Sequence, residues 1–241
     1  MRRSGLLMTL TALLASARLA GAPGVARGQE AKGAPPSAPS APVRLDRVVV
    51  RWHAPETGGV RRPQFIFERE LAFEARVEAL ADPDAEPGLY RDRHIRAALD
   101  HHIAETLLAS LPISPAPTST EVAQRAEAAR ISLEQRARGR ARLLAAAAAE
   151  GISSDELDAL LRRQARASLY LDRMVTPMLE PSDFELRLVL RSGATPFKGQ
   201  RYEDVAPALK RWYVGQRLSQ ALITYYQNAR ARVTLTILRA D

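Results

Sequence analysis

Three histidines and one glutamate lie close together in the segment YRDRHIRAALDHHIAETLLASL, and their types could support metal chemistry. On a helix, His101 and Glu105 would lie one turn apart on the same face. A catalytic zinc needs three protein ligands and an open position, so His94, seven residues before His101, would have to complete the cluster. The HExxH signature of zinc hydrolases is absent. We therefore interpret these groups, together with His102, as solvated polar residues of a helix.

Other catalytic motifs are missing from the sequence. There is no G-x-S-x-G motif for a serine nucleophile and no glycine loop of the phosphate-binding type. The carboxylate pairs Glu68 and Glu70, and Asp155 and Glu156, suit helix starts and solvated faces. We expect neither an enzyme nor a cofactor.

The amino terminus has the order of a secretory signal peptide. Arg2 and Arg3 precede a short apolar run, residues 6–15, and small residues follow. Cleavage after Ala22 or after Gly28 fits the small-residue rule; we prefer Gly28, which gives a signal peptide over residues 1–28. An uncleaved anchor is the alternative, although the run is well short of the roughly 20 residues that span a bilayer. A twin-arginine signal is a weaker alternative.

Composition after the signal is consistent with an exported binding protein. Residues 29–42 are rich in proline and alanine and read as a flexible linker. The chain has no cysteine, so neither disulfides nor thiolate metal sites are available. Its net charge is +8, carried almost entirely by arginine. We expect a periplasmic protein that does not bind nucleic acid, because aromatic residues for stacking are scarce.

Arginines recur along the segment 122–149, which reads as one long helix. They would suit acidic polypeptide segments or peripheral contact with an anionic membrane surface, although a solvated face shared with glutamates is the simpler interpretation. The arginines are Arg125, Arg130, Arg136, Arg138, Arg140 and Arg142.

The pattern of the folded part, residues 43–238, predicts strands at both ends and helices between them. VRLDRVVVRWH (43–53) and QFIFE (64–68) are typical of a hairpin, and RVTLTIL (232–238) of a closing strand. Because an isolated hairpin is marginal, the terminal strands are expected to form one small sheet. Helical periodicity starts near residue 68, resumes over 90–111, and returns in a short helix after Pro181 and a long one over 201–231.

One helix has a well-marked beginning. Ser153 and Glu156 have the S-x-x-E spacing of a capping box, just after Gly151. The helices before and after Gly151 therefore predict a helical hairpin.

This order, with LDRVVV, IRAALDHHIAETLLASL, AAEGISSDELDALLRRQARASLYLDRMV and ALITYYQNARARVTLTIL, resembles the chaperone module of SurA-type periplasmic chaperones. The resemblance implies a mainly α fold of the SurA and trigger-factor type, in which an N-terminal hairpin pairs with the C-terminal strand. It also implies ATP-independent binding of unfolded or extended polypeptide clients. Members with isomerase activity carry a parvulin domain before the last helix. Here the interval 176–200 is too short for a domain, so no prolyl isomerase activity is expected.

Aromatic and methionine side chains are the candidates for peptide contact. Methionine adapts to varied partners, and an exposed apolar patch edged by charge is a binding surface. Filling gaps between helices is an equally good interpretation of the same residues. A dedicated subunit that binds one folded envelope partner is the alternative function. The candidates are Tyr170, Met174, Met178, Trp212, Tyr213 and Tyr225.

Overall fold

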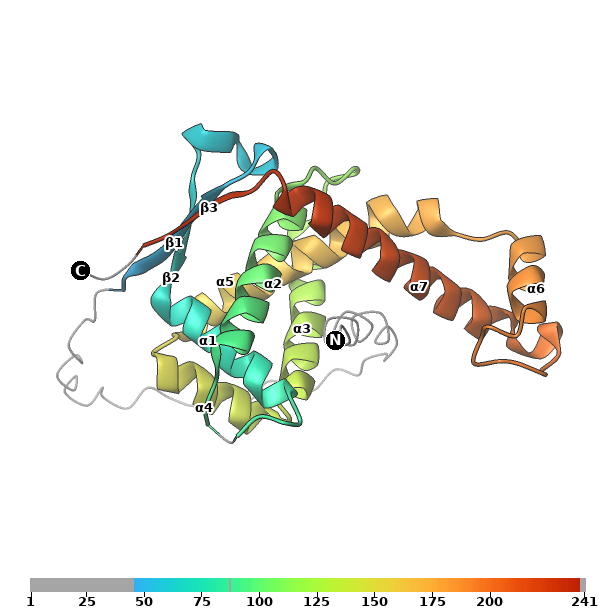
Figure 1. Cartoon of the computed structure of the whole chain (residues 1–241), viewed down its shortest axis with the longest axis horizontal. Coiled ribbons are helices and arrows are strands. Elements are labelled where there is room, and N and C mark those ends of the chain that lie inside the picture. Colours follow the sequence, from blue (N-terminus) through green and yellow to red (C-terminus); the bar gives the residue numbers. More distant parts are fainter. Residues whose placement is uncertain (1–45, 87, 239–241) are drawn as a thin grey trace, which may run out of the picture.

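The computed structural model describes residues 46–86 and 88–238, which form a mainly helical protein with one small sheet (Figure 1). The predicted signal peptide and linker lie outside the described residues. The strands are β1 (Val48–His53), β2 (Gln64–Phe67) and β3 (Thr234–Ile237). The helices are α1 (Glu68–Ala81), α2 (Asp92–Ser110), α3 (Ser119–Arg136), α4 (Arg140–Glu150), α5 (Ser154–Tyr170), α6 (Asp183–Arg191) and α7 (Tyr202–Arg230).

The sheet joins the two ends of the folded part, as predicted. Its order is β2-β1-β3, and both pairings are antiparallel. Val50 lies opposite Ile66 on one side and Ile237 on the other, with a bulge in β1 between Val48 and Val50. Val50, Trp52 and Ile66 are buried. The β-branched and aromatic residues of β1 thus anchor the sheet to the core.

The core of the helical body is built from apolar stripes on four helices. Phe73 of α1, Leu133 of α3, Leu143 of α4 and Leu160 of α5 belong to one buried cluster. A second cluster joins the sheet to α1 and α2. The third joins α2 and α5 to the second half of α7, through Leu108, Ala167, Leu218 and Leu222. No helix in the described ranges is both long enough and apolar enough to cross a membrane.

The predicted long helix over 122–149 is wrong, because the chain turns between α3 and α4. Arg138 and Gly139 both have positive φ, at 59° and 126°, and such backbone cannot continue an α-helix. The helix also starts earlier than expected. Its N-cap is Thr118, whose hydroxyl accepts a hydrogen bond from the Glu121 N–H at 3.2 Å.

The capping box at the start of α5 is confirmed, but the predicted helical hairpin around Gly151 is not. Ser153 Oγ accepts from the Glu156 N–H at 3.3 Å, and Gly151 closes α4 in the left-handed region. Nevertheless, α5 packs mainly on α2 and α3, whereas α4 packs on α1. The two helices contribute to the same core cluster through different neighbouring helices, and they do not pack closely on each other.

After α5 the chain leaves the body. A π-helical turn (Leu171–Val175) and a 3₁₀ turn, η5 (Thr176–Leu179), lead to α6, which lies at the far end of α7 (Figure 1). We call α6, the loop 192–201 and the first half of α7, to residue 214, the arm. Leu186 of α6, and Val205 and Leu209 of α7, are buried in it. The short helix, loop and long helix predicted here are confirmed.

Candidate peptide-binding surface

The arm exposes large apolar side chains on α6. Phe184 and Leu188 are 71% and 53% exposed. Four residues apart on one helix, they lie on the same face. Met178, in η5 between the body and α6, is 74% exposed. Large apolar residues exposed side by side are a candidate binding surface, whereas single exposed ones are ordinary.

Local sequence explains why α6 presents this face. Ser182 caps the helix, its hydroxyl accepting from the Glu185 N–H at 3.2 Å. In DFELRLVLR the apolar residues outnumber the positions that α7 can cover, so Leu186 is buried while Phe184 and Leu188 remain outside. The charged residues Arg187 and Arg191 lie beside them and are exposed. The result is an apolar stripe, Phe184 and Leu188, with a basic rim.

Three of the predicted contact residues lie where the body meets α7. Tyr170 and Tyr225 pack against the third core cluster, and both are half-buried. Met174 is half-buried in the π-helical turn. Burial raises the pKa of the Tyr225 phenol, whose hydroxyl has no hydrogen-bond partner among the described residues. These side chains largely fill space between helices.

The other three lie on or near the arm. Trp212 and Tyr213 are half-buried on α7, and their ring centroids are 6.5 Å apart. The Tyr213 hydroxyl donates to Glu185 Oε1 at 2.8 Å and so fastens α6 to α7. Of all six predicted residues, only Met178 is fully open to solvent. Phe184 and Leu188 were not predicted as contacts, although their spacing in DFELRLVLR was the available signal.

The histidines of α2 pair with carboxylates of α1 and of its C-cap residue Asp82, and do not form the zinc cluster considered from the sequence. His94 Nε2 lies 3.0 Å from Asp82 Oδ2, His101 Nδ1 2.7 Å from Glu78 Oε1, and His102 Nδ1 3.2 Å from Glu74 Oε1. The interpretation as solvated residues is wrong for His94 and His102, which are buried. Three histidine–carboxylate pairs therefore run along one helix interface.

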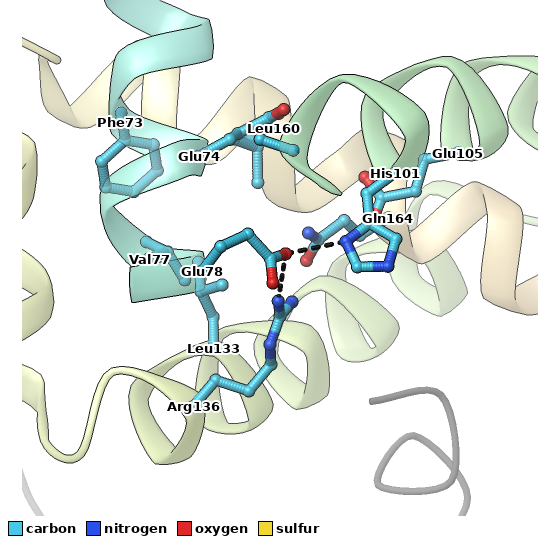
Figure 2. A pocket seen from close by; sticks show the side chains of 11 residues that line it. Phe73, Glu74, Val77, Glu78, His101, Glu105, Leu133, Arg136, Leu160 and Gln164 are labelled. Carbon is cyan, nitrogen blue, oxygen red and sulfur yellow. Dashed lines mark hydrogen bonds and ion pairs between the residues drawn. The ribbon is translucent and has the colours of Figure 1, made fainter. Parts of the chain in front are cut away.

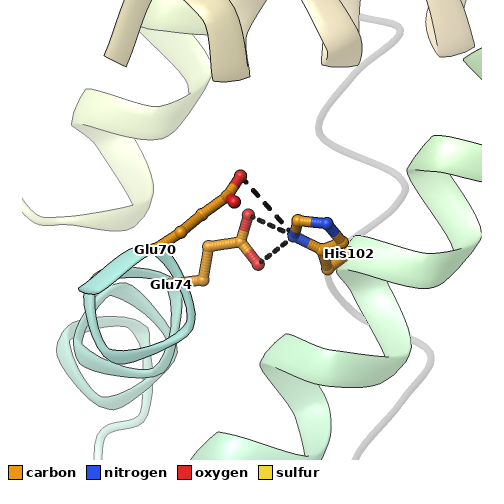
Figure 3. Close-up of side chains that lie close together, drawn as sticks. All are labelled: Glu70, Glu74 and His102. Atoms are coloured by element: carbon orange, nitrogen blue, oxygen red, sulfur yellow. Dashed lines mark hydrogen bonds and ion pairs between the residues drawn. The ribbon is translucent and has the colours of Figure 1, made fainter. Parts of the chain in front are cut away.

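A different trio has the spacing of metal ligands. Glu70, Glu74 and His102 offer one ligand atom each within 4.8 Å of one another (Figure 3). However, the guanidinium of Arg163 lies between the carboxylates, with Nη1 2.7 Å from Glu70 and Nη2 2.6 Å from Glu74. A metal ion would have to displace this cation. The arrangement is best explained as an ion-pair network that ties α5 to α1.

The network shifts several pKa values. Burial raises the pKa of Glu105, and the charge of Arg163 opposes this only in part. For Glu74, the effect of burial is outweighed by His102 and Arg163, so its pKa is lowered. Burial also disfavours the charged forms of Glu78 and His101. Their mutual hydrogen bond, helped by Arg136 at Glu78, overcomes this and lowers the pKa of Glu78 to about 2 while raising that of His101.

Two cavities lie near this network, and they differ in volume. Figure 2 shows a pocket lined by Glu78, His101 and Arg136, with a volume of about 20 Å³. That is room for about one water molecule and none for an organic substrate. A cleft of about 450 Å³ lies between β2, α1 and α5, beside Phe67 and Arg163. Its size would admit one large side chain or a small ligand.

No family model, curated protein or solved structure matches this chain. Function is therefore inferred from the chain's own residues. The described ranges hold an apolar stripe on the arm, a closed ion-pair network in the body and a strand at the edge of the sheet.

The Glu78–His101 pair predicts how stability depends on pH. Since the folded pKa of Glu78 is about 2, below its ordinary 4.5, its contribution is complete above about pH 4.5 and is lost as the pH falls towards 2. The folded pKa of His101 is raised, so its contribution is complete below 6.5 and is lost as the pH rises through the folded pKa. Urea unfolding should give the greatest contribution from this pair between about pH 4.5 and 6.5.

Glu78→Gln should flatten the acid side of that profile, since the proton uptake by Glu78 on unfolding disappears. The loss at pH 6 should be on the order of 3 kcal/mol. Glu68→Gln is the control, because Glu68 is an exposed glutamate of the same helix, in a surface pair with Arg47. A Glu78→Gln profile parallel to wild type between pH 2 and 4.5 would contradict the assignment.

Proposed function

We propose that this protein is an ATP-independent periplasmic chaperone-like protein that binds non-native polypeptide, including outer-membrane clients, and has no prolyl isomerase activity. The observation that carries the proposal is the exposed apolar stripe on the arm, Phe184 and Leu188. Unfolded chains expose apolar side chains that folded proteins bury, so such a stripe would favour them. Binding by burial alone is reversible and would need no nucleotide.

Residues on the arm and just before it have further features that suit binding of varied clients. Met178 is unbranched and flexible, so it can adapt to side chains of different shape. Trp212 and Tyr213 lie on the same arm and retain partial exposure. Arg191 beside the stripe would attract acidic segments, whereas Arg187 already pairs with Glu203 at 3.4 Å; both keep the apolar surface soluble. Such a surface is suited to binding many different polypeptide segments and not one particular shape.

The topology also supports the proposal. The C-terminal strand β3 pairs with β1 of the N-terminal hairpin, and a long helix precedes it. This is the arrangement that the resemblance to SurA-type chaperones implies. Between residues 176 and 200 the chain forms η5, α6 and a loop, in the interval where isomerases of that family carry a parvulin domain. The periplasmic location rests on the predicted signal peptide.

Aggregation assays test the proposal. A urea-unfolded outer-membrane β-barrel protein is diluted into buffer with equimolar mature protein, and light scattering is followed. Wild type should suppress scattering. The double variant Phe184→Ser, Leu188→Ser should need at least tenfold more protein for the same effect, because each side chain contributes roughly 1.5 to 3 kcal/mol when fully buried and about 1.4 kcal/mol is tenfold in affinity.

The control is Val60→Ser, Leu89→Ser. These residues are similarly exposed, at 67% and 59%, but lie outside the arm. They should leave suppression unchanged. If wild type fails to suppress aggregation and instead copurifies with one folded envelope protein in a fixed ratio, the dedicated interaction subunit is the better description.

A further inference from the structure

Among the described residues, nothing pairs with the outer edge of β3. Leu238 N–H donates to Val49 C=O at 2.9 Å, and the register places Thr236 opposite Arg51. In an antiparallel ladder, hydrogen-bonded and non-hydrogen-bonded pairs alternate. Thr234 and Thr236 therefore point their backbone groups at β1, whereas Leu235 and Ile237 point theirs away. Within residues 46–86 and 88–238, no backbone partner meets these outward groups.

The side chains next to this edge are apolar and open. Leu235 and Ile237 lie on the same face of the sheet as Trp52 and Val50, yet they are 37% and 66% exposed. An open strand edge is a template for another strand, and proteins usually protect it with lysine, proline or a covering element. TLTI contains neither residue. At the other edge of the sheet, Pro63 precedes β2 and α1 follows it directly.

The charged residues near β3 indicate what kind of segment would pair with its outer edge. Arg51, beside Thr236 on the other face of the sheet, and Arg230, just before β3, are exposed. Neither forms an ion pair with a carboxylate of the described residues. A second copy of the chain would bring its own arginines and a net positive charge against them. A segment with carboxylates on that face would be attracted instead.

We propose that the outer edge of β3 binds an extended segment of a non-native polypeptide by strand addition, with alternating apolar and acidic side chains as the preferred pattern. The identity of this partner rests on the proposed chaperone function. The N–H and C=O groups of Leu235 and Ile237 bond the added strand, and its apolar side chains pack beside theirs. The edge recognises backbone, so it accepts many sequences.

The test uses a fluorescent eight-residue peptide of alternating valine and glutamate with the full mature protein. Ile237→Pro removes an outward donor, whereas the bonds to β1 use the N–H groups of Thr236 and Leu238. The Kd of Ile237→Pro for the peptide should be about tenfold higher than that of wild type. Wild type should show a similar increase in Kd when the same peptide is N-methylated along one edge. Ile237→Thr keeps the N–H group and should lose about threefold at most. A lysine version of the peptide should bind about fivefold more weakly than the glutamate version.

Amide hydrogen exchange gives an independent readout. Exchange at Leu235 and Ile237 should slow on peptide binding, while Thr236, whose N–H faces β1, should exchange slowly with or without peptide. Equal binding of the N-methylated peptide, or unchanged exchange at both residues, would overturn strand addition. Normal peptide binding by Ile237→Pro would also overturn strand addition. If wild type nevertheless suppressed aggregation, the proposed function would stand. Edge-dependent peptide binding without suppression would support strand addition and contradict the chaperone.

Discussion

Arg163→Met is expected to lower the free energy of unfolding by about 3 to 5 kcal/mol, measured by urea denaturation at pH 7. Arg163 lies 2.7 Å from Glu70 and 2.6 Å from Glu74, and its Nε is 3.7 Å from Glu105. The pKa of Arg163 is raised: burial lowers it, but the three carboxylates outweigh burial. Without the guanidinium, Glu70 and Glu74 would remain partly buried with no cation except the adjacent histidine.

The matched control is the neighbouring Arg162→Met. Arg162 is exposed and forms no ion pair with the described residues, so its replacement should change stability by less than about 0.5 kcal/mol. Adding Glu74→Gln to Arg163→Met should restore part of the loss, because one buried charge is removed. Equal effects of the two arginine substitutions would show that the network does not hold α5 to α1.

Trp52→Ala is expected to cost about 3 to 5 kcal/mol as well. Trp52 is fully buried near the end of β1, the central strand of the sheet, where it lies opposite Gln64 of β2 and Leu235 of β3. Its removal would leave a cavity beneath the sheet and free β3 from the body. Urea denaturation followed by circular dichroism measures the loss, and faster amide exchange in β3 would report the release of that strand.

Trp52 Nε1 has no hydrogen-bond partner among the described residues, so the indole stabilises the fold by apolar packing and not by a hydrogen bond. Trp52→Phe should therefore cost less than Trp52→Ala. Trp212→Ala is the control: Trp212 is half-buried on the arm, and its loss should cost about 1 kcal/mol. If Trp212→Ala were the more harmful of the two, the sheet would not be the anchor of the fold.

The sequence was sufficient where periodicity or a cap decides structure. Alternation in VVVRWH and TLTIL identified strands at both ends, and the marginal stability of a lone hairpin correctly placed them in one sheet. The S-x-x-E spacing at Ser153 correctly marked the start of α5. These features depend on residues near one another in the chain or on a general rule of pairing.

Features that depend on distant contacts were not predictable. His102 has the same sequence signature whether it faces water or Glu74, and only the packing of α1 against α2 decides. The break at Gly139 was missed because an alanine- and arginine-rich segment favours helix on both sides of it. Phe184 and Leu188 looked like ordinary core residues of an amphipathic helix. They are exposed because α7 covers only one face of α6.

The most direct test is the binding of mature protein, residues 29–241, to one labelled outer-membrane β-barrel protein in its urea-unfolded and its folded, detergent-held form. Fluorescence anisotropy of wild type should show saturable binding of the unfolded form and none of the folded form. The Phe184→Ser, Leu188→Ser variant should bind the unfolded form at least tenfold more weakly. Equal binding of both forms, or of neither, would contradict a chaperone that recognises exposed apolar chain.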